Sequence, residues 1–311
     1  MTGPVGDLRP DAPAGLIVYA AMRTEARRLR RGLPDGPPVR RTGMGLAAAT
    51  RSAARFGGGS APVAAAGVGG GLTARLSPGD LVVATAIRGP DGTVLDCPSA
   101  PLLAAALRRR GGRVHLGPVL TTRRLVRDPG HRDRLASTGA LVVDTESAAW
   151  LAATTGPRVC VRAVADVPPY PLLRPATLVR LRAALRALDP VGPALRDWAA
   201  ATTVRQVLLG GPDPALAATG ADVWLLPGPP DSPSRPAATG WAGPPAYRVC
   251  DPAGLDPRWL AGARVVGVAA GPTTRPGLVA GVLAALCGLG AKEVRPDPTV
   301  PSTLPLEVTT P

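Results

Sequence analysis

Short apolar runs alternate with stretches of helical composition along most of this 311-residue chain. Pro62–Ala66, Leu81–Ile87 and Arg158–Ala165 are runs of this kind, each long enough for one strand. Strands joined by helices usually pair in parallel and are covered on both faces. The pattern therefore predicts an α/β fold: a three-layer αβα domain with a mostly parallel central sheet.

The alternation stops near residue 201 and starts again near Val204. A chain of this length can bury two separate cores. We expect a catalytic domain over residues 14–201, a smaller α/β domain over 204–290 with helices between its strands, and a Pro-rich tail over 291–311. The first 13 residues or so, rich in Pro, Gly and Asp, are expected to be a flexible lead-in.

The formal charge of +14 comes almost wholly from arginine, since Lys292 is the only lysine. Two interpretations stay open: a basic surface that attracts an anionic partner, or the composition of a GC-rich genome. The arginines are not interleaved with aromatic residues that could stack on bases, so no nucleic-acid partner is expected. Peripheral contact with a membrane stays possible.

Four cysteines are widely spaced, and His115 and His131 are the only histidines. This composition makes a zinc site improbable, and we expect neither a metal nor another cofactor. No apolar run approaches the ~20 residues that a bilayer-spanning helix needs, and the chain shows no signal-peptide core, so we expect a cytoplasmic protein.

Two apolar runs end in acids. Val143-Asp144-Thr145-Glu146 leads into a helix, and the strand ending Val-Arg-Ala-Val-Ala closes on Asp166. A third acid, Glu25, follows the first predicted strand. The ends of neighbouring parallel strands meet at one edge of a sheet, so these acids can face one cleft. Taken singly, each acid has a structural explanation, as a helix-terminal charge or a cap.

Together, three carboxyl groups suit the cleavage of a bond between a sugar and a base. Asp166, protonated through burial, can donate to the leaving base; Glu146 can accept from ribose hydroxyls; Glu25 can take a proton from water. The glycine-rich run Gly67–Gly71 is expected to turn sharply and approach a ligand closely.

Residues 15–200 resemble the nucleoside phosphorylase/nucleosidase superfamily, and in particular the methylthioadenosine/S-adenosylhomocysteine nucleosidases. The resemblance rests on five segments in the family's order: Ala21–Glu25, Thr42–Gly45, Ala66–Leu72 with Pro78–Asp80, Val143–Ala149 and Arg162–Asp166. It implies catalytic roles for Glu25 and Asp166. It also implies a homodimer and a set of substrate-binding residues: Gly45, Val68, Gly69, Gly70, Thr145 and Glu146.

Some residues depart from the family's pattern. Thr145 replaces a methionine, Val68 replaces a serine that binds phosphate in phosphorylases, and Thr121–Arg127 offers only Leu125 and Val126 where relatives place an aromatic residue. A carboxylate at Glu25 repels phosphate. We therefore expect a nucleosidase that uses water on an adenosyl compound. A phosphorylase with the same acids is the alternative.

Three segments look closest to the hopanoid-associated phosphorylase branch of this superfamily: Glu25–Arg27, Arg41–Gly45 and Gly67–Leu72. That resemblance implies removal of adenine from adenosylhopane, a membrane-lipid precursor. A basic face would then help the protein reach a substrate held at a bilayer.

Residues 205–290 resemble one lobe of hydroxymethylbutenyl diphosphate reductase, an iron–sulfur enzyme of isoprenoid synthesis. The similarity includes Ala221–Gly228, Leu255–Leu260 and Val266–Pro276. Cys250 and Cys287 do not fall at the cluster-ligand positions, so we expect a degenerate lobe without a cluster. An active reductase, or a non-catalytic partner of isoprenoid enzymes, stays as an alternative.

Overall fold

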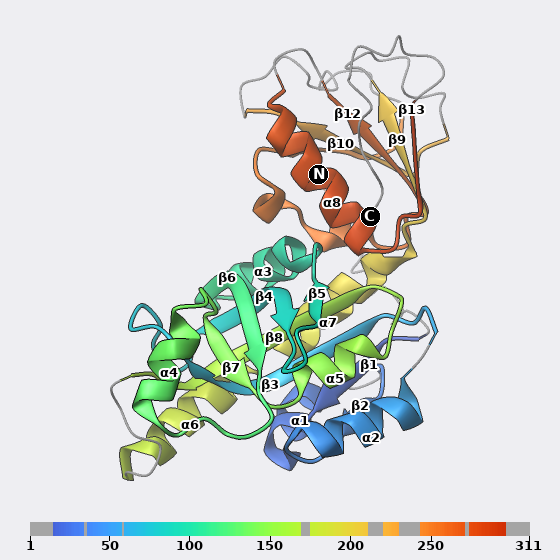
Figure 1. The fold of residues 1–311 in the computed structure, drawn as a ribbon. Helices are drawn as coiled ribbons and strands as arrows, with labels where there is room; N and C mark the ends of the chain where they lie inside the picture. Colours follow the sequence, from blue (N-terminus) through green and yellow to red (C-terminus); the bar gives the residue numbers. More distant parts are fainter. Residues whose placement is uncertain are drawn as a thin grey trace, which may run out of the picture.

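Two β-sheets, each with its own helices, make up the folded part of the protein (Figure 1). The computed structural model describes residues 15–33, 36–57, 59–168, 175–210, 220–229, 243–270 and 274–296. The predicted lead-in and most of the predicted tail lie outside these residues.

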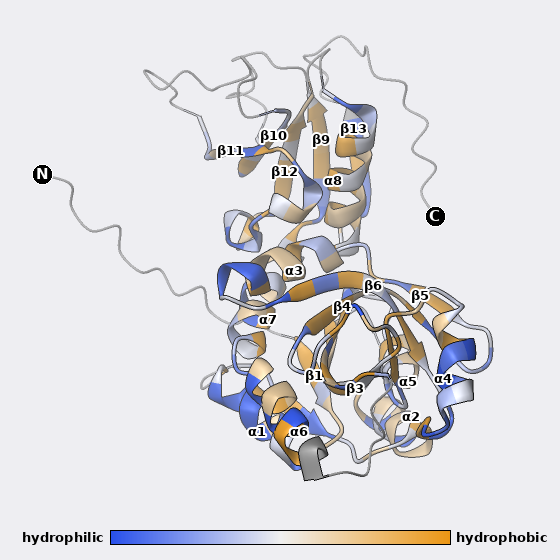
Figure 2. Cartoon of the chain, turned by 90° about the vertical axis from the view of Figure 1, so that its left-hand side faces the viewer, coloured by the Kyte–Doolittle hydropathy of each residue, from blue (hydrophilic) through white to orange (hydrophobic). Residues whose placement is uncertain are grey.

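The first sheet has eight strands, and five of them close into a ring. Its path is β2-β1-β3-β7-β6-β4-β5, and β8 pairs with both β3 and β4. The closed ring β3-β7-β6-β4-β8 is visible end-on in Figure 2. Most pairs are parallel, which confirms the predicted largely parallel sheet. The strands are β1 (Ile17–Ala20), β2 (Val39–Arg41), β3 (Val63–Gly71), β4 (Leu81–Arg88), β5 (Val94–Asp96), β6 (Val114–Thr121), β7 (Val142–Asp144) and β8 (Arg158–Asp166).

Helices pack on both sides of this sheet, as the three-layer prediction requires. One group comprises α1, α3, α6 and α7, in which α1 contacts α6 and α7, and α3 contacts α7; α2 and α5 form the other group. The helices of this unit are α1 (Arg23–Arg31), α2 (Leu46–Phe56), α3 (Ala100–Arg109), α4 (Pro129–Ala136), α5 (Ser147–Ala152), α6 (Pro175–Ala187) and α7 (Val191–Ala200).

The core consists mainly of Ala, Val and Leu, as the scarcity of aromatic residues predicts. The exceptions are large and specific. Trp150 is fully buried and stacks on Tyr19 at 5.7 Å between ring centroids. Trp198 is also fully buried, and its indole N–H donates to Ser99 Oγ at 3.1 Å. Few but fully buried aromatic rings thus fill the space that small aliphatic side chains leave.

The second sheet is parallel throughout, in the order β11-β10-β12-β9-β13. Its last strand corrects the predicted Pro-rich tail, because β13 begins at Glu293, three residues after the predicted end of the domain at residue 290. Val294 pairs with Val207 at the edge of the sheet, so the tail prediction was wrong for these four residues. The elements of this unit are β9 (Gln206–Gly210), β10 (Val223–Pro227), β11 (Ala246–Val249), β12 (Val265–Ala269), α8 (Pro276–Gly288) and β13 (Glu293–Pro296).

Two short 3-10 turns, η3 (Pro252–Gly254) and η4 (Pro257–Leu260), occupy the connection between β11 and β12, where we expected a helix. Each turn begins with an aspartate cap followed by proline. Asp251 accepts from Ala253 N and Asp256 from Arg258 N, and two such starts within seven residues leave no room for a longer helix. The helices expected between β9, β10 and β11 lie outside the described residues.

The second unit packs on the first through α3 and α7. Turns η3 and η4, with α8, contact these helices, and the buried core is continuous across the junction. Arg109 on α3 forms an ion pair with Asp256 at 3.0 Å. In Figure 1 the second unit lies at the top, above α3, while α1, α4 and α6 lie at the opposite end. None of the described helices is both long and apolar enough to span a bilayer.

Candidate active site

A cavity of about 220 Å³ lies where β3, β7 and β8 end, between α1, α4 and α6. Its described lining residues come from eight separate stretches of the chain, and all of them belong to the first unit. They are Ala21, Met22, Glu25, Met44, Val68, Gly69, Gly70, Thr122, Leu125, Val126, Arg132, Val143, Asp144, Thr145, Glu146, Ala165, Asp166 and Leu181.

Glu25 is buried at one wall of the cavity, in the first turn of α1. Its Oε2 accepts from Met22 N at 2.7 Å, which closes that turn, and its Oε1 accepts from Val68 N at 2.8 Å on β3. Burial raises the pKa of this carboxyl, while the two amide hydrogen bonds and Arg162 act in the opposite direction. The side chain is both a helix cap and a fixed acceptor, since each oxygen keeps a second lone pair for a proton from water.

Glu146 occupies the N-cap position of α5 and points across the cavity. Its Oε1 accepts from Gly45 N at 2.7 Å and from Thr145 Oγ1 at 2.5 Å. Among the described residues no hydrogen bond reaches its Oε2, and Arg162 Nη2 lies 4.0 Å away. This arrangement orients one oxygen and leaves the other able to accept from a hydroxyl group of a ligand.

Asp166 ends β8 at the third wall and is paired with Arg132 of α4. Arg132 Nη2 lies 2.5 Å from Asp166 Oδ2, and both side chains are almost fully buried. Burial raises the pKa of Asp166. The positive charge of Arg132, and to a smaller extent that of Arg180, lowers it. The net effect favours a carboxyl group that can hold a proton and release it to a ligand.

Arg162 connects the segments that carry these acids. It is fully buried, donates to Asp144 Oδ2 at 2.8 Å and to Ser147 Oγ at 2.7 Å, and lies over the Trp150 ring at 5.4 Å. Burial disfavours its charge, but Asp144 overcomes this effect and leaves the pKa of Arg162 above its usual value. Asp144 in turn accepts from the backbone N–H groups of Glu146 and Ser147 at the start of α5. This pair fixes where Glu146 stands.

The glycine run is part of β3 rather than a sharp turn, which corrects our expectation. None of Gly67–Gly71 has a positive φ, and pairing with β8 continues through the run with a shift in register between Gly69 and Gly70. The expected close approach is present. A Cβ on Gly67 would lie 2.7 Å from Glu25 Oε1, and one on Gly70 would lie 2.6 Å from Arg132 Nη2.

The cavity brings together the residues that the sequence analysis selected. Glu25, Asp166, Glu146, Thr145, Val68, Gly69 and Gly70 line it, and Gly45 borders it through the hydrogen bond to Glu146. Three further residues were missed: Asp144, Arg162 and Arg132. Asp144 and Arg162 fall within the recognised segments, whereas no local signal separates Arg132 from the many other arginines.

The outer part of the cavity is apolar. Met44, which is 64 % exposed, and Leu125 and Val126 line it, and none of its described lining residues is aromatic. A ligand's base would therefore contact aliphatic side chains. The described residues also contain no group of three His, Cys, Asp or Glu side chains placed to hold a metal ion.

Comparison with known proteins supports this picture at the level of the fold. Residues 35–167 match the family model of the phosphorylase superfamily, and no curated protein matches the chain. The chain is similar to the 5'-methylthioadenosine/S-adenosyl homocysteine nucleosidase of Campylobacter jejuni, with 16 % identity over 58 % of this chain and 98 % of that one, and a TM-score of 0.51.

Two further solved structures show comparable similarity. They are the corresponding nucleosidase of Neisseria meningitidis in complex with methylthio-immucillin-A (20 % identity, 58 % of this chain, 98 % of that chain, TM-score 0.47) and the futalosine hydrolase of Helicobacter pylori (15 %, 58 %, 95 %, 0.48). The family match over residues 35–167 and the similarity to the Campylobacter jejuni nucleosidase show that the first unit has a nucleoside phosphorylase-like fold. The family match and this fold agree with the expectation of an enzyme of the N-glycosidase class.

Proposed function

We propose that the first unit is a nucleosidase that cleaves the N-glycosidic bond of an adenosyl compound with water as the nucleophile. The observation that carries the proposal is the convergence of Glu25, Glu146 and Asp166 on one cavity of the described structure. Solved structures of similar fold include nucleosidases named for methylthioadenosine and S-adenosylhomocysteine, which supports an adenosyl substrate.

Each acid has one task in this scheme. The bond between the sugar carbon and the base nitrogen breaks, its electron pair leaves with the base, and Asp166 supplies a proton to that base. Glu146 accepts hydrogen bonds from ribose hydroxyls, and its negative charge stabilises the positive charge that develops on the sugar. Glu25 takes a proton from water as the water oxygen bonds to the sugar carbon, so the products are free base and free sugar.

Phosphorolysis is the alternative, and the charges in the cavity favour water. A phosphate dianion would enter a site lined by four acidic side chains, those of Glu25, Asp144, Glu146 and Asp166. Arg132 is the one cation among its described lining residues, and it is already paired with Asp166. Val68 offers a backbone N–H, but that group donates to Glu25.

The substrate's 5′ substituent is proposed to be apolar, with adenosylhopane as the specific candidate. Met44 and Leu125 give the outer cavity an apolar lining that suits such a group better than a charged one. The basic character of the chain fits a substrate presented at a lipid surface. A homodimer is also part of the proposal.

The second unit is proposed to be a docking lobe without an iron–sulfur cluster. Its two cysteines are Cys250, which is exposed, and Cys287, which lies on α8, while Cys97 and Cys160 are buried in the first unit. Three thiolates therefore cannot converge in this lobe. Iron analysis of anaerobically purified protein should find none in stoichiometric amount, and a stoichiometric cluster would refute this part.

Adenine release from 5′-alkylated adenosines, measured with and without phosphate, tests the proposal. We expect release in phosphate-free buffer, with free sugar and no sugar phosphate among the products. Strict dependence on phosphate would refute the role of Glu25 and favour the phosphorylase. Absence of release from every purine nucleoside tried, by folded protein, would refute the nucleosidase itself.

A further inference from the structure

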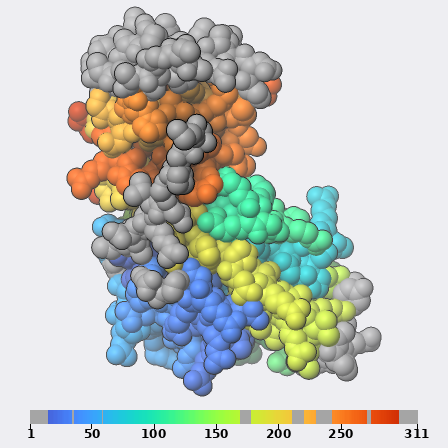
Figure 3. Space-filling model, turned by 180° about the vertical axis from the view of Figure 1, so that it is seen from behind, coloured from blue at the N-terminus to red at the C-terminus, as the bar shows by residue number. Residues whose placement is uncertain are grey.

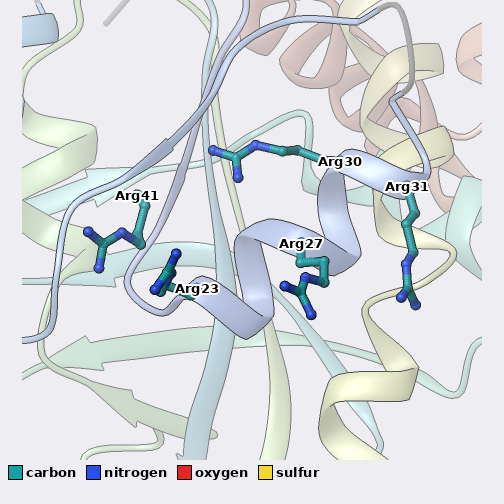
Figure 4. A pocket seen from close by; sticks show the side chains of 5 residues that line it. All are labelled: Arg23, Arg27, Arg30, Arg31 and Arg41. Atoms are coloured by element: carbon teal, nitrogen blue, oxygen red, sulfur yellow. The ribbon is translucent and has the colours of Figure 1, made fainter.

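A second hollow, of about 540 Å³, lies outside the active site and is lined by five arginines. These are Arg23, Arg27, Arg30 and Arg31 of α1 and Arg41 at the end of β2 (Figure 4). All five are exposed, and none is within ion-pair distance of an acidic side chain of the described structure. The one acid of α1, Glu25, points to the opposite side of the helix, into the active site.

The spacing of these arginines explains the charged face. Positions 23, 27, 30 and 31 lie on one side of an α-helix, since side chains three or four residues apart are neighbours. Arg30 Nη2 donates to Val39 O at 2.8 Å and holds α1 to β2, so Arg41 lies on the same face. Like charges at this spacing repel one another, and α1 therefore carries an electrostatic cost that a bound anion would remove.

Helix α6 adjoins this face and contributes exposed apolar side chains. α1 contacts α6, and Arg28 pairs with Asp189 just after α6 at 2.7 Å. Figure 2 shows the hydrophilic α1 beside α6, and Figure 3 shows their segments adjoining at the back of the molecule. Leu178 and Val179 of α6 are 64 % and 67 % exposed, and Arg182 and Arg186 on the same helix are exposed too.

We infer that the face formed by α1, β2 and α6, called here the α1–α6 face, docks on an anionic lipid surface. Clustered arginines attract the negative surface of a bilayer, and neighbouring exposed Leu and Val side chains can enter its interfacial region. A nucleic acid fits less well, because the face offers apolar aliphatic side chains beside the charges and no exposed aromatic residue among its described members.

The position of the active site agrees with this orientation. Met22 at the N-cap of α1, Glu25 on α1 and Leu181 on α6 line the catalytic cavity, so both helices of the α1–α6 face border it. A protein docked in this way would collect an apolar substrate from the membrane. The inference concerns binding, and its failure would leave the proposed hydrolysis untouched.

Co-sedimentation of the full chain with lipid vesicles tests the inference. We expect binding to vesicles of phosphatidylglycerol and phosphatidylcholine, weakening with salt, and none to phosphatidylcholine alone. R23Q/R27Q/R31Q should weaken binding about a hundredfold, on the basis of roughly 1 kcal/mol for each arginine at such a surface. L178S/V179S should weaken it about tenfold through lost apolar burial.

The matched control is R75Q/R134Q/R264Q, which removes the same charge from three exposed arginines outside the α1–α6 face. It should bind anionic vesicles within about threefold of the wild type, because it lowers only the long-range attraction between the net positive charge of the protein and the vesicles. Equal loss of binding in both triple variants would overturn the inference, as would equal binding of the wild type to neutral vesicles.

Nucleic acid is the other outcome of the test. If the wild type binds RNA more tightly than anionic vesicles, and R23Q/R27Q/R31Q loses this RNA binding, the face belongs to nucleic acid instead. Thermal melts of each variant check folding.

Discussion

Arg132 Nη2 lies 2.5 Å from Asp166 Oδ2, so the carboxyl proposed as the general acid is paired with a buried cation. The pair joins α4 to the end of β8 across Gly70, where a side chain would collide with Arg132. Such pairing stabilises the deprotonated acid after it has given its proton to the base, while burial keeps the pKa of Asp166 raised.

Removal of Arg132 should change the pH profile of the reaction. An acid catalyst is active below its pKa, and activity is lost as the pH rises through that value. Arg132 lowers the pKa of Asp166, so R132Q should move the alkaline limb of kcat/KM to higher pH. The pH profiles of kcat/KM for R132Q and the wild type test this prediction. An unchanged alkaline limb in R132Q would mean that Asp166 is not the general acid.

Replacement of Asp166 by Asn should remove the proton donor while keeping the shape of the side chain. We expect kcat to fall about a hundredfold or more, the usual contribution of a general acid. The control is D189N, which changes a half-exposed partner of Arg28 at the surface. Unchanged kcat in D166N would mean that the base leaves without help from this residue.

Glu25 should show its effect at the acid end of the profile. A general base must be deprotonated, and burial raises the pKa of Glu25 above the usual 4.5. Activity should therefore fall with an acid-limb midpoint above pH 4.5. E25Q should abolish turnover and also lower the melting temperature, because its amide group would face a backbone N–H of Met22 or Val68. The cost of such a clash of donors is about 1–3 kcal/mol.

The melting temperature and kcat of E25Q together distinguish a catalytic role of Glu25 from a structural one. If the melting temperature falls while kcat stays within threefold or so of wild type, Glu25 is only a helix cap and the hydrolytic scheme loses its base. E293Q, at a half-exposed position of β13, serves as the control for the loss of one negative charge.

The sequence predicted most strands and helices because apolar runs and their periodicity are local properties. It did not predict β5, since Val94–Asp96 is short and lies at an edge with little burial. Closure of the ring depends on β8 pairing with both β3 and β4, which are distant in sequence. The three acids could be selected because each lies at or just after the end of an apolar strand and within a segment that resembles the nucleosidases. Arg132 could not, since its role arises only where α4 meets β8.

A side chain at Gly67 should not fit, because β3 passes close to Glu25 and Arg162 at this residue. A Cβ there would lie 2.7 Å from Glu25 Oε1 and 2.8 Å from Arg162 Nη1. Glu25 Oε1 is held by Val68 N, and the Arg162 side chain is held through its Nε by Asp144. G67A should therefore displace Glu25, lower kcat at least about tenfold and destabilise the protein by about 1–3 kcal/mol, as overpacking does. G254A, where an added Cβ meets nothing within 4 Å, is the matched control. Normal activity in G67A would mean that the site tolerates movement of Glu25.

The junction between the two units depends on Asp256. Its buried carboxylate pairs with Arg109 at 3.0 Å and with Arg258 at 2.6 Å. Burial alone would raise its pKa, but the hydrogen bonds of Arg258 and the charge of Arg109 outweigh burial and lower it. A lowered pKa gives stability that is present at neutral pH and lost as the pH falls through the folded-state value.

D256N should therefore destabilise the protein at neutral pH by about 2 kcal/mol and flatten the acid side of its stability profile. Asparagine can still cap η4, so the loss reports the ion pairs. D251N removes an exposed carboxylate that caps η3 without an ion pair, and it should leave the melting temperature nearly unchanged. Because all described residues lining the active site come from the first unit, kcat should stay at the wild-type value in both variants. A fall of kcat in D256N at temperatures where the protein is folded would show instead that the second unit controls the active site.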